Sequence, residues 1–69
     1  MRHLEQELIA LRQDTIEMWK LVISQVRNAG DAILGFDKEL AQKVSVREKK
    51  VDAYELKIDS ACENIIALH

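Results

Sequence analysis

Apolar and neutral residues recur at intervals of three and four along the first half of the chain. This alternation places them on one side of an α-helix and predicts a buried stripe. The stripe comprises Leu4, Leu8, Leu11, Thr15, Met18, Val22, Val26, Ala29 and Ile33, and Trp19 and Ile23 widen it on one side. Gly30 costs about 1 kcal/mol relative to alanine within a helix, but the periodicity continues past it. We therefore expect one helix over residues 3–34.

The only convincing break in the helical pattern is Gly35-Phe36-Asp37. Glycine is preferred just after a helix C-terminus, where a left-handed residue closes the last turn, and aspartate is a preferred N-cap. The sequence thus predicts a turn over residues 35–37 and a second helix over residues 38–68. The apolar stripe of that second helix consists of Leu40, Val44, Val51, Tyr54, Ile58, Cys62 and Ile65.

Two long helices joined by a short turn predict an all-α antiparallel helical hairpin that forms a single unit over residues 1–69. A chain of 69 residues with one cysteine has a marginal core and no internal disulfide. A hairpin also leaves a broad apolar face that it cannot cover by itself. We therefore expect self-association to complete the core.

Charge and hydropathy exclude several classes of function. The net charge of −2 gives no basic surface for nucleic acid, and no apolar stretch approaches the roughly 20 residues of a membrane span. The N-terminus lacks the charged-then-apolar layout of a signal peptide, so we expect a cytoplasmic location. Cys62 has no histidine at a spacing that would activate it, and no second set of acids accompanies the acidic row described next, so we do not expect an enzyme.

Five carboxylates follow one line along the second helix, and we call this row the acidic ladder. It consists of Glu48, Asp52, Glu55, Asp59 and Glu63. Like charges one turn apart destabilise a helix by about 0.2–0.5 kcal/mol per pair, and Lys57 points to a different side. Helical geometry places Glu55 toward the seam between the helices. The ladder is either an acidic rim paired with Lys or Arg of the first helix or of a partner, or a hard-cation site with oxygen ligands from facing helices.

The second helix resembles that of the PhoU family. The resemblance rests on Asp37 at the helix start, on the run Val51-Asp52-Ala-Tyr-Glu55-Leu-Lys-Ile58-Asp59, and on the continuation Cys62-Glu-Asn-Ile-Ile-Ala-Leu68. The opening Leu4-Glu-Gln-Glu-Leu8 and the Met18-Trp19 region resemble the first helix of that family. The resemblance implies that the hairpin is part of a PhoU-type three-helix bundle.

Members of this family are negative regulators of phosphate uptake and of the phosphate-starvation response. The resemblance therefore implies contacts with a phosphate ABC transporter and a sensor histidine kinase. It also implies a metal-binding motif for iron or another hard cation, which falls here on Glu55 and Asp59, with Asp52 one step upstream. The family's third helix, with its second acidic motif, is not in this sequence, so half of each family metal site is missing.

The three-four repeat of the first helix supports a second interpretation equally well. A purely structural coiled-coil or oligomerisation hairpin would show the same periodicity.

Overall fold

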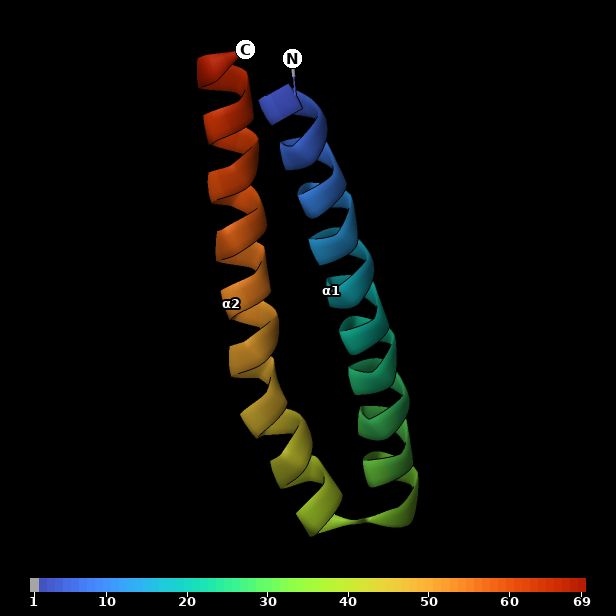
Figure 1. The fold of residues 1–69 in the computed structure, drawn as a ribbon. Helices are drawn as coiled ribbons and strands as arrows, with labels where there is room; N and C mark the ends of the chain where they lie inside the picture. Colours follow the sequence, from blue (N-terminus) through green and yellow to red (C-terminus); the bar gives the residue numbers. More distant parts are fainter. Residues whose placement is uncertain (1) are drawn as a thin grey trace.

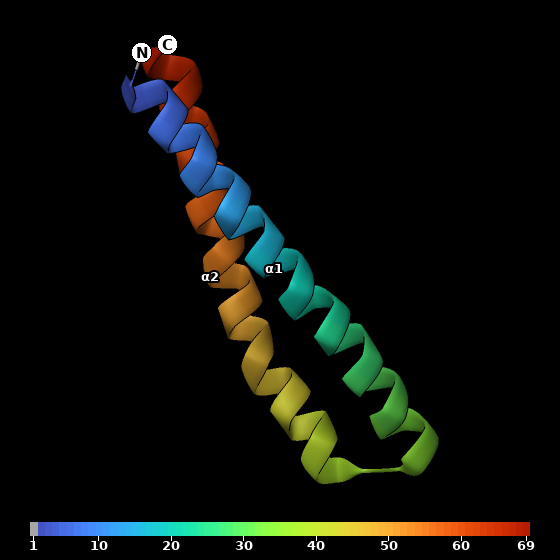
Figure 2. The same ribbon diagram turned by 45° about the vertical axis from the view of Figure 1, so that its right-hand side comes forward.

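The computed structural model describes residues 2–69 and shows two helices, α1 (Arg2–Gly35) and α2 (Lys38–Leu68). They lie antiparallel and side by side, with the chain ends together and the turn at the opposite end (Figures 1 and 2). The Cα atoms extend over 51 × 14 × 12 Å. The all-α hairpin is confirmed, and both helices begin and end within one residue of the expected positions.

The turn uses Phe36 in place of the expected glycine. The amide of Phe36 donates to the carbonyl of Ile33 (3.4 Å) and the amide of Asp37 to that of Ala32 (2.9 Å), which closes the end of α1. The left-handed residue in this motif is Phe36, with φ of 51°. The sequence prediction for Gly35 was wrong, because α1 continues through that residue and the next position takes the strain. A non-glycine residue in this conformation costs about 1–2 kcal/mol.

Asp37 begins α2 in the way the sequence predicts. Its backbone is extended (φ −87°, ψ 99°), and its side chain accepts a hydrogen bond from the amide of Leu40 at 3.0 Å. This contact satisfies one of the amides that lack a partner within the first turn of a helix. The short connection and the cap together turn the chain back along α1.

The seam between the helices is formed on α1 by two rows of residues spaced seven apart. The first row is Leu4, Leu11, Met18, Gln25 and Ala32, and the second is Glu7, Asp14, Leu21 and Asn28. All nine are buried or half-buried. A seven-residue repeat keeps one strip of a helix against its neighbour, as in coiled coils. Several members of this strip are polar, which the sequence prediction did not anticipate.

The predicted buried stripe of α1 is therefore wrong in about half of its members. Leu8 is 48% exposed, Val26 68% and Ile33 73%. Trp19, which the sequence analysis places at the side of this stripe, is 58% exposed in the hairpin. One neighbouring helix covers only one strip of a helix surface, and the apolar surface of α1 is wider than that strip. In contrast, the predicted stripe of α2 is confirmed, since all seven of its members are buried or half-buried.

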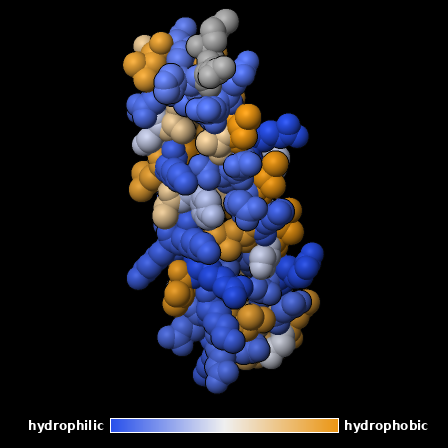
Figure 3. Space-filling model, viewed as in Figure 1, coloured by the Kyte–Doolittle hydropathy of each residue, from blue (hydrophilic) through white to orange (hydrophobic). Residues whose placement is uncertain are grey.

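Little of the hairpin is fully enclosed. Among the described residues, Ala32 and Val51 are the buried hydrophobic side chains, each 6% exposed, and no side chain is completely buried. Hydrophobic atoms lie at the surface among hydrophilic ones over much of the length of the molecule (Figure 3). Neither helix contains, within residues 2–69, a stretch long and apolar enough to cross a membrane. The contact between α1 and α2 thus forms a thin core that leaves most apolar side chains partly in water.

The seam divides the surface of the hairpin into two sides of different chemistry. We call one the open side; it is lined by Val22, Val26, Ala29 and Ile33 of α1 and by Ala41, Glu48 and Glu55 of α2. We call the other the polar side; its charged and polar residues are Glu7, Asp14, Glu17 and Lys20 of α1 and Lys50, Lys57 and Asn64 of α2, and Leu11, Leu21 and Ile65 lie among them.

Candidate functional site

The acidic ladder lies along the open side of α2. All five of its residues are exposed, and Glu48 and Glu55, which are seven residues apart, line the open-side groove. This groove has a volume of about 320 Å³ and also contains Val22, Val26 and Ala29 of α1. The position of Glu55 beside the seam agrees with the helical geometry of the sequence. The groove thus combines an apolar wall from α1 with an acidic wall from α2.

Gln25 lies at the base of this groove, and the sequence analysis missed it. The side chain is 4% exposed, and its Nε2 donates to the carbonyl of Val44 (2.6 Å) and to Oε1 of Glu48 (3.0 Å). Its Oε1 is buried without a hydrogen-bond partner, an arrangement that typically costs about 1–3 kcal/mol. The signal in the sequence was its spacing, because Gln25 is seven residues from both Met18 and Ala32 in the seam row.

The predicted metal ligands Glu55, Asp59 and Asp52 all lie on one helix and all face solvent. Glu55 and Asp59 are one turn apart, so their carboxylates are spaced to reach one ion. Hard cations take about six oxygen ligands, and in residues 2–69 no three His, Cys, Asp or Glu side chains come together as a metal set. The donor chemistry fits a hard cation, but the hairpin supplies only part of the ligands.

The acidic ladder takes part in no ion pair within the described part of the chain. Glu48 accepts the amide hydrogen bond from Gln25. The expected pairing of the ladder with Lys or Arg of the first helix is therefore wrong for this hairpin. The physical reason is the placement of the cations, because Lys20 of α1 lines the polar side and pairs with Glu17.

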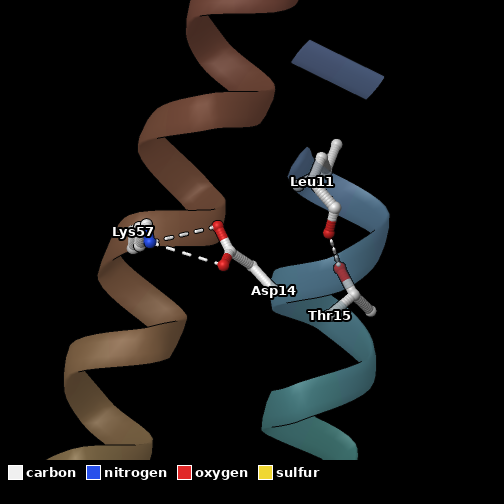
Figure 4. A network of polar contacts seen from close by, with 4 residues as sticks. All are labelled: Leu11, Asp14, Thr15 and Lys57. Atoms are coloured by element: carbon white, nitrogen blue, oxygen red, sulfur yellow. Dashed lines mark hydrogen bonds and ion pairs between the residues drawn. The ribbon is translucent and has the colours of Figure 1, made fainter. Parts of the chain in front are cut away.

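On the polar side, in contrast, each charged residue named for it above except Lys50 has a partner among the described residues. Lys57 Nζ lies 3.3 Å from both carboxylate oxygens of Asp14 across the seam (Figure 4). Lys20 pairs with Glu17 along α1 at 3.4 Å. At the chain ends, Nε2 of His69 lies 3.0 Å from Oε2 of Glu7, which ties the last residue of the chain to α1. The contacts of Lys57 with Asp14 and of His69 with Glu7 join the two helices, whereas the pair of Lys20 and Glu17 lies within α1.

The hydroxyl group of Thr15 lies on the otherwise apolar surface of α1 and is hydrogen-bonded within the helix. It donates to the carbonyl of Leu11 in the preceding turn at 2.7 Å (Figure 4). This contact satisfies the hydroxyl within the helix, so Thr15 demands no outside partner. The unmatched groups of the open side are thus the ladder carboxylates, the Gln25 oxygen and the exposed apolar side chains.

Two comparisons with known proteins bear on the family. The profile of the PhoU domain family matches residues 15–69. A phosphate-specific transport system accessory protein PhoU homolog from a Burkholderia species is 41% identical over 51 residues, which make up 74% of this chain. Those residues correspond to 22% of that relative, so the chain spans a minor part of its length. No solved structure gives a significant match.

Proposed function

Because the chain belongs to the PhoU domain family, we propose that it is part of a negative regulator of phosphate uptake and phosphate-starvation signalling, and not an enzyme. The proposal draws on the family match over residues 15–69 and on a relative described as an accessory protein of phosphate-specific transport. Such a regulator acts in the cytoplasm by contacts with a phosphate ABC transporter and a sensor histidine kinase. Its mechanism is therefore protein binding.

The observation that supports a binding role most directly is the open side of the hairpin. Exposed large apolar side chains gather there beside carboxylates that have no ion-pair partner among the described residues, whereas Asp14 and Lys57 of the polar side pair across the seam. Contiguous exposed apolar surface on a small protein marks an interaction site. An acidic border adds selectivity, because it favours partners with Lys or Arg at the matching edge and repels acidic ones.

Direct binding tests the regulatory proposal. We expect the chain to bind the purified ATPase subunit of a phosphate transporter, or the cytoplasmic part of a phosphate-sensing kinase, in titration calorimetry. Val26→Lys on the open side should weaken that binding at least about tenfold, the size expected for a central apolar contact. Ala10→Lys is the control, since Ala10 is also exposed but lines the polar side of the seam. Self-association without binding to either partner would favour the purely structural hairpin, which the seven-residue seam repeat also supports.

Metal affinity is a second part of the proposal and concerns Glu55, Asp59 and Asp52. These carboxylates would hold iron or another hard cation through oxygen, with the remaining ligands coming from an associated helix. A bound cation would offset the repulsion within the ladder, and binding to the folded state alone raises the melting temperature by mass action. On this view, affinity for metal depends on association and is weak in a single hairpin.

Thermal melting at constant ionic strength tests the metal part. We expect iron(III) or manganese to raise the melting temperature of the wild type, and Glu55→Gln combined with Asp59→Asn to abolish the rise. The matched control is Glu17→Gln combined with Asp31→Asn on α1, which removes the same charge away from the ladder. Unchanged melting of the associated wild type with every metal would refute the metal part and leave the regulatory part standing.

A further inference from the structure

The basic residues of α2 are concentrated in the half of the helix that follows the turn. Residues 38–50 contain five basic and two acidic side chains, a net charge of +3, whereas residues 51–68 contain one basic and four acidic side chains, a net charge of −3. Three of the five basic residues, Lys43, Arg47 and Lys50, follow each other at intervals of four and three, so they lie along one line of the helix. We call this line the basic strip, and helical geometry places it on the opposite edge of α2 from the acidic ladder.

The register of the hairpin places no acidic residue of the α1 seam opposite the basic strip. Lys57 meets a carboxylate of α1 across the seam at 3.3 Å. Seven residues closer to the turn on both helices, Lys50 lies beside Leu21 in one groove. A further seven residues place Lys43 level with Asn28. All three residues of the basic strip are exposed, and they form no ion pair with the described residues.

Two grooves adjoin the basic strip and add apolar surface to its charges. One has a volume of about 420 Å³ and lies along α2, where Lys43 and Arg47 flank Val46, which is 62% exposed. The other has a volume of about 250 Å³ and lies between the helices, where Lys50 and the half-buried Tyr54 line it from α2. The surface thus offers cations in a line together with apolar contact at their side.

We propose that the basic strip is a docking site for a short acidic helix of a partner protein, whose carboxylates are spaced at intervals of four and three. Such a helix presents three carboxylates on one line over about 10 Å, the same length as from Lys43 to Lys50. Unlike charges with matching spacing select the partner and its register. An apolar residue one turn along the partner helix covers Val46. The strip lies away from the open side, so this binding is separate from the binding proposed above.

Acidic residues at both ends of the basic strip favour a short partner segment over a long polyanion. Glu39 lines the groove of Val46 one turn before Lys43, and Glu17 lines the groove of Lys50. A nucleic acid carries a phosphate at every step, and an anionic membrane carries charge over a wide area. Either would bring negative charge against these two carboxylates, whereas a helix with three carboxylates ends before it reaches them.

Fluorescence anisotropy with the full chain tests the proposal. The probe is a labelled alanine and glutamine peptide of roughly 20 residues, long enough to form a helix, with three glutamates at intervals of four and three. We expect it to bind at low ionic strength, and Arg47→Glu to weaken the binding roughly tenfold, because an attractive contact becomes repulsive. The matched control is Lys49→Glu, since Lys49 is exposed on α2 and lies outside both grooves. It should change the dissociation constant by less than about threefold.

A second peptide separates docking from attraction by net charge. It has the same composition with its glutamates at intervals of five, which spreads them around the helix, and it should bind roughly fivefold more weakly. Val26→Lys on the open side should leave the binding of the first peptide within about threefold, so a failure here and a failure of the open-side proposal are distinguishable. Circular dichroism shows that each variant is folded.

Three results would overturn the proposal. The first is that the wild type shows no saturable binding of the first peptide. The second is that the two peptides bind equally, or that Arg47→Glu and Lys49→Glu weaken binding equally, since the effect would then be one of net charge. The third is that a single-stranded oligonucleotide or anionic vesicles bind more tightly than the first peptide in the same buffer, which would assign the basic strip to a nucleic acid or a membrane.

Discussion

The two sides of the hairpin seam are built from the same two helices and differ in how their charges are matched. On the polar side, Lys57 of α2 meets Asp14 of α1 across the seam, at 3.3 Å. On the open side, Glu48 and Glu55 of α2 lie beside Val22 and Val26 of α1, and no cation faces them within the described residues. On the polar side a cation and a carboxylate from different helices pair with each other, whereas the carboxylates on the open side have no ion-pair partner among the described residues.

This difference explains why α1 directs its more polar strip toward α2. The seam row of α1 contains Asp14 and Gln25, while Trp19 and Ile23 remain exposed. A hairpin optimised to stand alone would bury the most apolar strip of each helix. This orientation agrees with the three-helix bundle that the family resemblance implies, in which each helix contacts two neighbours.

The largest expected effect concerns the seam that both sides share. Val51 is 6% exposed, so Val51→Asp buries a charge without a partner, which costs about 3–5 kcal/mol. A domain of this size has only a few kcal/mol of stability, and we expect the helical circular dichroism signal to be largely lost at 25 °C. Ala53→Asp is the matched control, since Ala53 is exposed and lies one turn from Lys49 and Lys57. A cooperative melt of Val51→Asp near that of the wild type would contradict the thin core described here.

The amount that the sequence could predict differs between the two helices. The spacing of apolar residues along α2 predicted correctly which residues of that helix are buried. Its apolar positions, such as Val44, Val51 and Ile58, are few and are flanked by charged residues. The apolar positions of α1 are too numerous for one strip, so its period identified a helix but not its orientation. The location of Glu55 beside the seam followed from helical geometry alone.

Other parts of the site depend on contacts that no local pattern shows. Gln25 is polar and near the centre of a helix, so only the choice of the seam row reveals that it is buried. The sequence analysis expected the left-handed residue of the turn at Gly35, whereas the structure has it at Phe36, one position later. The end of a helix depends on whether one more helical hydrogen bond outweighs the backbone strain of the residue that follows, and sequence assignments of helix ends vary by one or two residues. The acidic ladder, finally, forms no ion pair with the described residues, so the hairpin does not show which groups would meet its carboxylates.

A second prediction concerns the open side and the orphaned oxygen of Gln25. Gln25→Leu removes that buried acceptor and adds apolar contact with Val22 and Val51, at the loss of two hydrogen bonds. The two acceptors of the Gln25 amide have other hydrogen-bond donors, because the Val44 carbonyl lies within α2 and accepts from a backbone amide, and Glu48 is exposed to water. We expect the free energy of unfolding to rise by about 1 kcal/mol in urea titration. Gln42→Leu, at an exposed position of α2, should change it little, and a fall of similar size for Gln25→Leu would show that the two hydrogen bonds dominate.

The smallest expected effect concerns the ion pair of the polar side. Lys57 is 65% exposed and Asp14 is 24% exposed, so water screens the pair, and we expect a coupling energy between about 0.5 and 1 kcal/mol. A double-mutant cycle with Asp14→Asn and Lys57→Met measures this coupling directly. The same cycle on Glu17 and Lys20, which lie 3.4 Å apart on α1 and are both more than half exposed, should give no more than about 0.5 kcal/mol.

Both couplings should fall in 1 M salt, where the screening length is about 3 Å. If the coupling between Asp14 and Lys57 were no larger than that of the pair on α1, the polar side would contribute no more to the register of the helices than an ordinary surface charge. The register would then be set by the apolar contacts of Val51 and its neighbours alone.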